Sequence, residues 1–206
     1  MEKLIKKSQR IYVAGHLGMA GSAIIKALIN SGYGDKKKGG EILTQSRKEL
    51  DLLDASSVLN WFESNKPEII IIAAAKVGGI AANNNFPFEF ISDNLRIQQN
   101  IFQSALKIGA KRLLFLGSSC IYPKESLQPI KEEYLLSGYL EPTNEPYALA
   151  KIAGIKTCEA LRKEYGFDAI SLMPTNMYGP GDNYDPENSH VFASLIRKIV
   201  FAKKNR

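Results

Sequence analysis

Hydrophobic and polar positions along this chain follow two alternating periods. Ile11–Ala14 is a short apolar run that ends at Gly15, and apolar residues from Met19 to Ile29 then recur every three or four positions, as on one face of a helix. Ile69–Ala75 is apolar at every position, which is typical of a central parallel strand covered on both sides. The pattern also predicts strands at 41–44, 112–116 and 169–173, and helices at 55–65, 90–108, 145–165 and 191–201. Elements in this order indicate right-handed βαβ units, and therefore an α/β fold with a doubly wound parallel sheet and helices on both faces.

Composition and charge narrow the classes of partner. The chain has 206 residues, of which 45% are hydrophobic and 23% charged, and its formal net charge is +6. Much of the basic excess lies at Lys36–Lys38 and 203–206, which is typical of solvated loops and ends, and the sequence contains no nucleic-acid recognition signature. Cys120 and Cys158 lack a CxxC spacing, so we expect neither a disulfide framework nor a metal site. With no signal peptide and no run of roughly 20 apolar residues, we expect no membrane partner and a cytoplasmic location.

A glycine-rich turn joins the first predicted strand to the first predicted helix. Gly15, Gly18 and Gly21 are spaced GxxGxxG. Glycines at such a junction allow a tight turn, close approach of the backbone to a pyrophosphate and close packing of helix on strand, while the helix N-terminus supplies unpaired N–H groups. A purely structural turn is the alternative, but it accounts poorly for all three glycines. We therefore predict a Rossmann-type dinucleotide-binding loop formed by Gly15, His16, Leu17, Gly18, Met19, Ala20 and Gly21.

The residues after the second predicted strand indicate which dinucleotide is bound. An acidic residue at this point binds the ribose 2′-hydroxyl of NAD, whereas a cation favours the 2′-phosphate of NADP. Here Arg47 and Lys48 follow the strand, and Arg47 can hold a phosphate through two parallel hydrogen bonds. Asp51 and Asp54 come later, where the next helix is expected to start. The sequence thus favours NADP(H), unless Arg47 and Lys48 merely line a solvated loop.

The start of the predicted helix 145–165 is well marked. Asn144 can cap it through its side chain, Glu145 suits the positive end of the helix dipole and Pro146 suits the first turn. Tyr147 and Lys151 are therefore expected in the first two turns of this helix.

Three residues have the order and spacing of a carbonyl-reduction site. Ser118 directly follows the predicted strand 112–116 and Gly117, at the strand end that faces the ligand crevice of a parallel sheet. Tyr147 and Lys151 lie four residues apart, on one face of the predicted helix. The lysine charge is expected to lower the pKa of the tyrosine and bring it nearer neutrality. We predict that Tyr147 exchanges a proton with a carbonyl that Ser118 polarises, although a YxxxK match alone would indicate only a solvated helix face.

Several stretches of the chain resemble a known family. These stretches are Ala73–Ile80, Phe115–Pro123, Glu141–Ala148, Met173–Pro180 and Asn188–His190. They look like the GDP-L-fucose synthase family of the extended short-chain dehydrogenase/reductases, and the likeness covers nearly the whole chain. The resemblance implies an NADPH-dependent enzyme that epimerises GDP-4-keto-6-deoxy-D-mannose at C3 and C5 and reduces it at C4, giving GDP-L-fucose. It also implies a homodimer, for which the helices near 95–108 and 148–164 are candidates.

The resemblance also assigns roles to individual residues. The catalytic residues it implies are Ser118, Cys120, Tyr147, Lys151 and His190, of which Cys120 and His190 form the epimerisation pair. Lys198 resembles a position that contacts the substrate diphosphate. Beyond the glycine loop and Arg47, the cofactor-binding residues it implies are Leu116, Gly117, Ser118, Ser119, Lys151, Pro174, Thr175, Asn176, Met177 and His190.

Cys120 and His190 also suit epimerisation on chemical grounds. A ketone at C4 acidifies the hydrogens at C3 and C5, and inversion needs a base on one face of the sugar and an acid on the other. Both side chains have ordinary pKa values within about 2 units of neutrality. Without the resemblance, Cys120 would be interpreted as a small buried hydrophobe and His190 as a surface loop residue.

The expected division of the chain is uneven. Residues 1–174 are expected to form the NADP-binding domain with the catalytic residues, and 175–206 the start of a truncated substrate-binding lobe that is otherwise largely missing. Residues 33–38 look like a short inserted loop, exposed to solvent. Two alternatives stay open. One is another NAD(P)-dependent nucleotide-sugar epimerase or dehydratase, against which Cys120, His190 and Arg47 argue. The other is a non-catalytic cofactor-binding fragment that needs a complementing chain.

Overall fold

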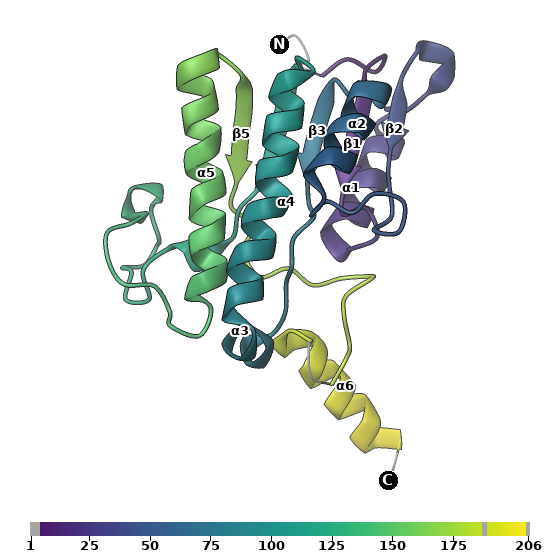
Figure 1. The fold of residues 1–206 in the computed structure, drawn as a ribbon. Helices are drawn as coiled ribbons and strands as arrows, with labels where there is room; N and C mark the ends of the chain where they lie inside the picture. Colours follow the sequence, from purple (N-terminus) through teal and green to yellow (C-terminus); the bar gives the residue numbers. More distant parts are fainter. Residues whose placement is uncertain (1–4, 187–188, 205–206) are drawn as a thin grey trace.

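The strands form one parallel sheet with helices packed on both faces. The computed structural model describes residues 5–186 and 189–204, and within them the strand order is β2-β1-β3-β4-β5 (Figure 1). The strands are β1 (Arg10–Ala14), β2 (Glu41–Leu43), β3 (Ile69–Ile72), β4 (Arg112–Leu116) and β5 (Asp168–Leu172). The helices are α1 (Met19–Asn30), α2 (Ala55–Asn65), α3 (Ile80–Asn85), α4 (Pro87–Lys107), α5 (Glu145–Tyr165) and α6 (Val191–Lys204), with short 3-10 helices η1 (Lys36–Lys38), η2 (Ser119–Ile121) and η3 (Glu132–Tyr134). Across the part of the chain described, no helix combines the length and apolar character needed to cross a bilayer.

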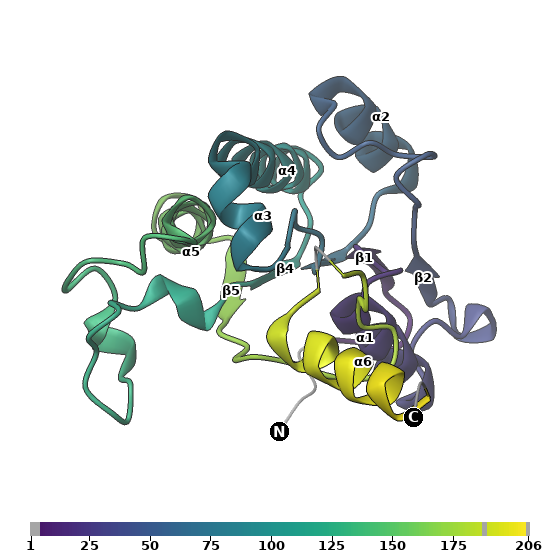
Figure 2. The ribbon, with the colours of Figure 1, turned by 90° about the horizontal axis from the view of Figure 1, so that it is seen from below.

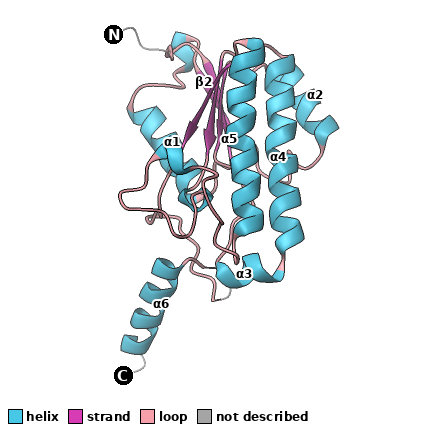
Figure 3. Cartoon of the chain, turned by 90° about the vertical axis from the view of Figure 1, so that its left-hand side faces the viewer, coloured by secondary structure: helices cyan, strands magenta, loops and turns pink. Residues whose placement is uncertain are grey.

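Alternate residues of the central strands contribute to two separate cores. Ile70 and Ile72 face the larger cluster, to which α2, α4 and α5 contribute, whereas Ile69 and Ile71 face the smaller cluster under α1. All four side chains are at most 5% exposed, which confirms that β3 is covered on both sides. Figures 2 and 3 show α1 on one face of the sheet and α2, α4 and α5 on the other, so the predicted doubly wound sheet is confirmed.

Two stretches differ from the predicted pattern. β3 ends at Ile72, so Ala73–Ala75 leave the sheet and form a loop instead of continuing the strand. The helix predicted to begin at residue 90 begins at Pro87, and the separate helix α3 precedes it. Pro87 lacks an N–H group and has a fixed φ, so it suits a first turn and ends any continuous helix at Phe86.

The inserted stretch at 33–38 is exposed only in its second half. Lys36–Lys38 are exposed and form η1, whose first turn is capped by the side chain of Asp35. Tyr33 instead packs on the smaller core cluster, and its hydroxyl donates a hydrogen bond to the carbonyl of Ile5 at 3.2 Å. The prediction of a fully exposed loop was therefore wrong at Tyr33, because an aromatic ring next to apolar side chains gains from burial.

The strand order creates a topological switch point between β1 and β3. The chain leaves β1 to one side to form β2, then returns across β1 and forms β3 on its other side. In open α/β sheets, ligands bind at such points, outside the carboxyl ends of the strands. Ala14 pairs with Ile72 at these carboxyl ends, so the loops after β1 and β3 begin side by side. The same edge of the sheet, at the lower end in Figure 1, receives the loops after β4 and β5.

Candidate active site

Two of the three loop glycines are required by the packing of the chain itself. Gly15 has φ +82°, and a Cβ atom there would lie 2.6 Å from the backbone nitrogen of Ala74, in the loop after β3. A Cβ at Gly21 would overlap the carbonyl oxygen of Gly15 and lie 2.9 Å from Cα of His16. Gly15 and Gly21 thus let the turn, the first helix and the loop after β3 come together.

Gly18 differs because nothing inside the chain requires its bare backbone. A Cβ atom there would make only an ordinary contact, 3.4 Å from the carbonyl oxygen of Gly15. Gly18 is exposed and is the N-cap residue of α1. It has no side chain that could accept hydrogen bonds from the first N–H groups of the helix. The helix end therefore presents N–H donors beside an open backbone edge, which is the arrangement that suits a pyrophosphate. The residues present fit a dinucleotide.

Arg47 lies on an exposed turn directly after β2. The turn is held by Glu49, whose carboxylate accepts hydrogen bonds from the backbone N–H of Ser46 at 2.8 Å and from its hydroxyl at 2.7 Å. Arg47 and Lys48 project from the tip of this turn and are exposed. Considering only the residues that are described, no hydrogen bond or ion pair engages the Arg47 guanidinium, which leaves its donors available to a phosphate. Asp54 caps the start of α2, which is where the sequence predicts that the next helix begins.

Ser118 and Cys120 come together at the start of η2, beyond the end of β4. The Ser118 hydroxyl oxygen accepts a hydrogen bond from the Cys120 thiol, with 3.2 Å between Sγ and Oγ, and a second one from the Cys120 backbone N–H at 3.4 Å. Burial raises the pKa of the Cys120 thiol, while the bond to Ser118 and the charge of Lys151 act in the opposite direction. Cys120 is only partly exposed and sits beside groups that can stabilise a thiolate, unlike an inert core cysteine.

Tyr147 and Lys151 lie in the first two turns of α5, as predicted. Glu145 stands in the first turn and proline occupies one of the first two positions, which confirms both of those start signals. The prediction that the Asn144 side chain caps the helix was wrong. Asn144 has ψ 9°, outside the extended region that an N-cap side chain needs to reach the following N–H groups.

The expected lowering of the Tyr147 pKa is contradicted. Burial raises the pKa of Tyr147, the neighbouring Cys120 raises it further, and only a hydrogen bond with Ser118 lowers it. The Lys151 ammonium donates instead to the carbonyl of Leu116 at 2.7 Å and lies 5.6 Å from the centroid of the Tyr147 ring. Burial also lowers the pKa of Lys151 to about 8. Burial is therefore the largest effect on the Tyr147 phenol, which stays protonated at neutral pH and can donate a proton.

The loops after β4 and β5 are joined at the same edge. The backbone N–H of Gly117 donates to the carbonyl of Leu172 at 2.8 Å, and that of Ser119 donates to the carbonyl of Pro174 at 3.3 Å. The predicted cofactor residues Thr175, Asn176 and Met177 follow in an exposed loop. This edge thus gathers the glycine loop, the serine-cysteine pair and the β5 loop around the switch point.

Both the sequence and the fold of the chain match known proteins. A family model described as "NAD dependent epimerase/dehydratase family" matches residues 11–205, which is nearly the whole chain. The chain belongs to this family.

Within the epimerase/dehydratase family, the chain is similar to several GDP-L-fucose synthases. It is 54% identical over 199 residues to GDP-L-fucose synthase 1 of Arabidopsis thaliana, with 97% of this chain and 60% of that protein covered. It is 51% identical over 191 residues to GDP-L-fucose synthase of Escherichia coli (strain K12), covering 93% and 58%. A crystal structure of a GDP-L-fucose synthetase from Naegleria fowleri bound to NADP matches with a TM-score of 0.85 at 30% identity, covering 98% and 60%. The motif resemblance is confirmed as a likeness to these proteins, of whose length the chain spans about 60%.

For two residues predicted for the site of this epimerase/dehydratase family member, the described part of the chain shows no contact with the cluster. His190 is exposed directly before α6, and its carbonyl accepts a hydrogen bond from the N–H of Ser194 at 2.9 Å. The preceding carbonyl, of Ser189, lies against Gly79 at the start of α3, while Asn188 lies outside the described residues. No contact found in residues 5–186 and 189–204 joins His190 to Cys120. Lys198 is exposed on α6.

Sequence reasoning missed a polar clamp on the loop after β3. Asn94, buried in α4, accepts a hydrogen bond from the Lys76 N–H at 2.9 Å and donates to the Lys76 carbonyl at 3.0 Å. It thereby fixes the loop that packs against Gly15. Asn94 and Gln98 are both buried and lie one helical turn apart on α4. Two amide side chains four residues apart in an amphipathic helix are a pattern from which buried polar contacts could have been predicted.

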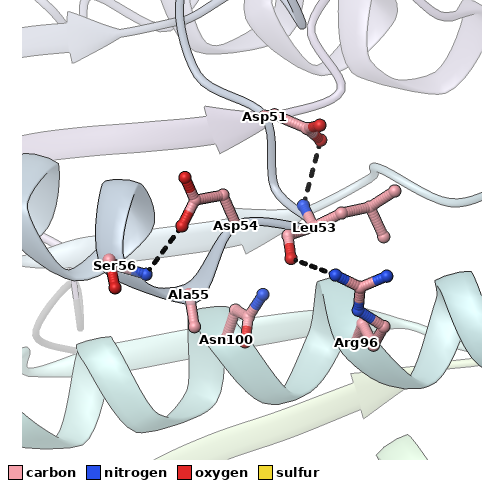
Figure 4. A pocket seen from close by; sticks show the side chains of 7 residues that line it. All are labelled: Asp51, Leu53, Asp54, Ala55, Ser56, Arg96 and Asn100. Atoms are coloured by element: carbon pink, nitrogen blue, oxygen red, sulfur yellow. Dashed lines mark hydrogen bonds between the residues drawn. The ribbon is translucent and has the colours of Figure 1, made fainter.

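A separate hollow of about 400 Å³ lies between the loop before α2 and the middle of α4 (Figure 4). Its lining residues are Asp51, Leu53, Asp54, Ala55, Ser56, Arg96 and Asn100. Arg96 donates to the carbonyl of Leu53 at 2.8 Å, and Asp51 accepts from the Leu53 N–H at 3.0 Å. These polar groups fasten the loop to α4. We therefore interpret the hollow as a result of this packing and not as a ligand site.

Proposed function

We propose that this chain carries out the chemistry of a GDP-L-fucose synthase, converting GDP-4-keto-6-deoxy-D-mannose to GDP-L-fucose with NADPH. The observation that carries the proposal is the Ser118–Cys120 contact beside Tyr147 and Lys151. Serine, tyrosine and lysine suit the reduction of a carbonyl, but that reaction has no use for a thiol. A thiol in the same cluster adds an acid-base group for the carbons next to the carbonyl. The similarity to named GDP-L-fucose synthases supports the same substrate.

The glycine loop and Arg47 are proposed to hold NADPH. The N–H groups at the start of α1 and the open edge of Gly18 suit the pyrophosphate, and the Arg47 guanidinium suits the 2′-phosphate. The loop residues Thr175, Asn176 and Met177 and the Ser118–Ser119 segment would border the nicotinamide end. When bound, the cofactor supplies the hydride that reduces C4.

Tyr147 is proposed as the proton donor to the C4 oxygen. Burial keeps the pKa of its phenol raised, so the proton that the reduction needs is present at neutral pH. Ser118 is within hydrogen-bonding reach of the phenol and would polarise the same carbonyl. Lys151 would hold the ribose through ammonium donors that its bond to the Leu116 carbonyl leaves available.

Cys120 and His190 are proposed as the epimerisation pair. The Ser118 hydroxyl and the Lys151 charge both favour the Cys120 thiolate, which would remove the C3 and C5 protons in turn. His190 would return a proton to the opposite face of the ring. Among the described residues, His190 is exposed directly before α6 and no contact joins it to Cys120.

The assembly and surroundings of the protein are part of the same proposal. Residues 1–174 would form the cofactor domain, and 175–206 would begin a substrate lobe in which Lys198 meets the diphosphate. Helices α4 and α5 lie side by side on one face of the sheet, where a second copy could add a matching pair to form a homodimer (Figure 3). The free thiol of Cys120 suits the reducing cytoplasm.

A second candidate function is cofactor binding without turnover until another chain completes the substrate lobe. The observation that favours it is the exposed apolar face of α6, where Val191, Leu195 and Ile199 are 66%, 51% and 67% exposed. Apolar side chains in such number normally pack against a partner.

One assay separates the two candidates. The purified chain is mixed with NADPH and GDP-4-keto-6-deoxy-D-mannose, and the loss of nicotinamide absorbance is followed. Turnover supports the synthase, whereas NADPH binding without turnover supports the second candidate. In an active protein, Cys120→Ala should stop deuterium entry from solvent at C3 and C5 while leaving some reduction at C4. Cys158→Ala, a buried cysteine outside the site, is the matched control. Exchange at the wild-type rate in Cys120→Ala would refute the base assignment.

A further inference from the structure

The Lys151 ammonium lies over the ring of Phe115. Its nitrogen is 4.8 Å from the ring centroid, closer than to the Tyr147 ring. Phe115 is 1% exposed and Lys151 is 4% exposed, so water screens this contact very little. An ammonium above an aromatic face is attracted by the negative face of the ring, and more strongly when both groups are desolvated.

Gly154 makes this position of the Phe115 ring possible. A Cβ atom at Gly154 would overlap Cζ of the ring, lie 2.6 Å from its Cε1 and lie 2.8 Å from Oε1 of Gln98. Glycine in the interior of a helix is unfavourable relative to alanine, so its place in the middle of α5 needs a packing reason. The notch that it leaves is that reason, because the ring edge fills it.

Gln98 holds the same turn of α5 through a hydrogen bond from α4. Its amide nitrogen donates to the carbonyl of Ala150 at 2.9 Å, and the side chain is 4% exposed. This bond ties α4 to the residue directly before Lys151. The Phe115 ring, the Gly154 notch and the Gln98 amide therefore all act on the one helical turn that carries the lysine.

The other groups near Lys151 do not replace the ring. The Leu116 carbonyl accepts one of its three donors. The titratable groups that face it are Cys120 from η2 and Tyr147 from its own helix, and both are neutral in their protonated forms. The Phe115 ring and the Leu116 carbonyl thus both favour a charged lysine regardless of how the thiol and phenol titrate, and of the two only the ring belongs to a side chain that can be replaced.

We propose that Phe115, seated in the Gly154 notch and backed by Gln98, is a positioning residue that sets the place and the charge of Lys151. Its importance for catalysis rests on the proposed function, in which Lys151 holds the ribose. Its effect on the lysine charge does not, and can be measured without substrate or cofactor.

The test is a pH titration of the Lys151 side-chain nitrogen by NMR on the full chain, with Lys151→Met used to assign the signal. Replacing Phe115 by a trifluorinated phenylalanine keeps the shape of the ring but weakens its negative face. The titration midpoint should fall by about one pH unit. Phe115→Leu should shift it in the same direction. Phe102→Leu is the matched control, because this buried ring lies 5.7 Å from Phe115 and should leave the midpoint unchanged.

Gly154→Ala tests the notch. It should lower the midpoint by displacing the ring, and the double variant Gly154→Ala/Phe115→Leu should titrate like Phe115→Leu alone. An unchanged midpoint with the fluorinated ring, or an equal shift in Phe102→Leu, would overturn the proposal even if the chain were fully active. If turnover were absent but the midpoint shifted as expected, the proposed function would fail while the role of Phe115 stood.

Discussion

The hydroxyl oxygen of Ser118 lies 3.2 Å from the thiol sulfur of Cys120, and the same hydroxyl bonds to the Tyr147 phenol. One small side chain thus touches both the group proposed for epimerisation and the group proposed for reduction. Because a hydroxyl can donate or accept, it can stabilise a thiolate at one stage and a phenolate at another. The two proposed steps would therefore be linked electrostatically through Ser118.

Ser118→Ala is expected to raise the pKa of Cys120. The serine bond lowers the thiol pKa against the effect of burial, so its loss leaves burial less opposed. At neutral pH less thiolate is present, and alkylation by iodoacetamide should slow. The pH at which the alkylation rate reaches half of its maximum should move upward. Ser118→Thr, which keeps the hydroxyl, should behave like the parent.

The measurement is the alkylation rate against pH in a Cys158→Ala background, so that a single thiol reacts. A midpoint that stayed in place or moved downward in Ser118→Ala would show that the hydroxyl does not favour the thiolate.

Lys151→Met is expected to stabilise the fold at neutral pH while removing activity. Burial lowers the pKa of Lys151 from 10.5 to about 8, so keeping it charged at pH 7 costs about 3 kcal/mol. Between these two pKa values the unfolded chain binds the proton and the folded chain does not. The wild type therefore gains stability relative to the variant as pH rises from 8 to 10.5.

Urea unfolding of both proteins across that pH range checks the prediction. Lys156→Met is the control, because this exposed lysine on the same helix pairs with Glu159 and should change stability by less than about 1 kcal/mol. If Lys151→Met were less stable than the wild type at pH 7, the ammonium would be contributing more than its burial costs.

The sheet and the glycine loop could be predicted from sequence because local pattern determines them. The uninterrupted isoleucines of Ile69–Ile72 fit only a strand covered on both sides, and that is where they lie. Gly15 and Gly21 sit between a strand and a helix, where chain packing demands them. The isoleucine run and the glycine spacing are both visible in the sequence, although the Ala74 backbone that requires glycine at position 15 belongs to a distant loop.

The electrostatics of the site could not be predicted in the same way. The spacing of Tyr147 and Lys151 gives a shared helix face, but not the Phe115 ring and the Leu116 carbonyl that β4 brings beneath it. These long-range contacts and burial, rather than spacing, determine both pKa values. Whether the Asn144 side chain caps α5 likewise depends on one backbone ψ angle. The position of His190 depends on a loop whose sequence has no periodic pattern.

Gly21→Ala and Gly18→Ala are expected to separate folding from cofactor binding. At Gly21 the new methyl group would overlap the Gly15 carbonyl, so the free energy of unfolding should fall by about 3 kcal/mol. At Gly18 the methyl group meets only an ordinary contact, so stability should change by about 1 kcal/mol or less. NADPH binding should nevertheless weaken in Gly18→Ala, because the methyl group covers the open edge. Thermal unfolding and fluorescence titration measure the two effects, and a Gly18→Ala protein that bound NADPH normally would remove the role assigned to that edge.

Arg47→Ala is expected to change which nicotinamide cofactor the chain prefers. The Arg47 guanidinium projects from the turn after β2 without a partner among the residues described, so its removal leaves no internal donor or acceptor unpaired. A charge-assisted pair with the 2′-phosphate is worth about 1.5–3 kcal/mol, so the Kd for NADPH should rise about tenfold to a hundredfold. The Kd for NADH should hardly change, because NADH lacks that phosphate. Lys48→Ala on the same turn controls for a general loss of positive charge and should cost less, since an ammonium cannot form two parallel bonds. Parallel losses for NADPH and NADH in Arg47→Ala would mean that the turn, rather than the guanidinium, holds the cofactor.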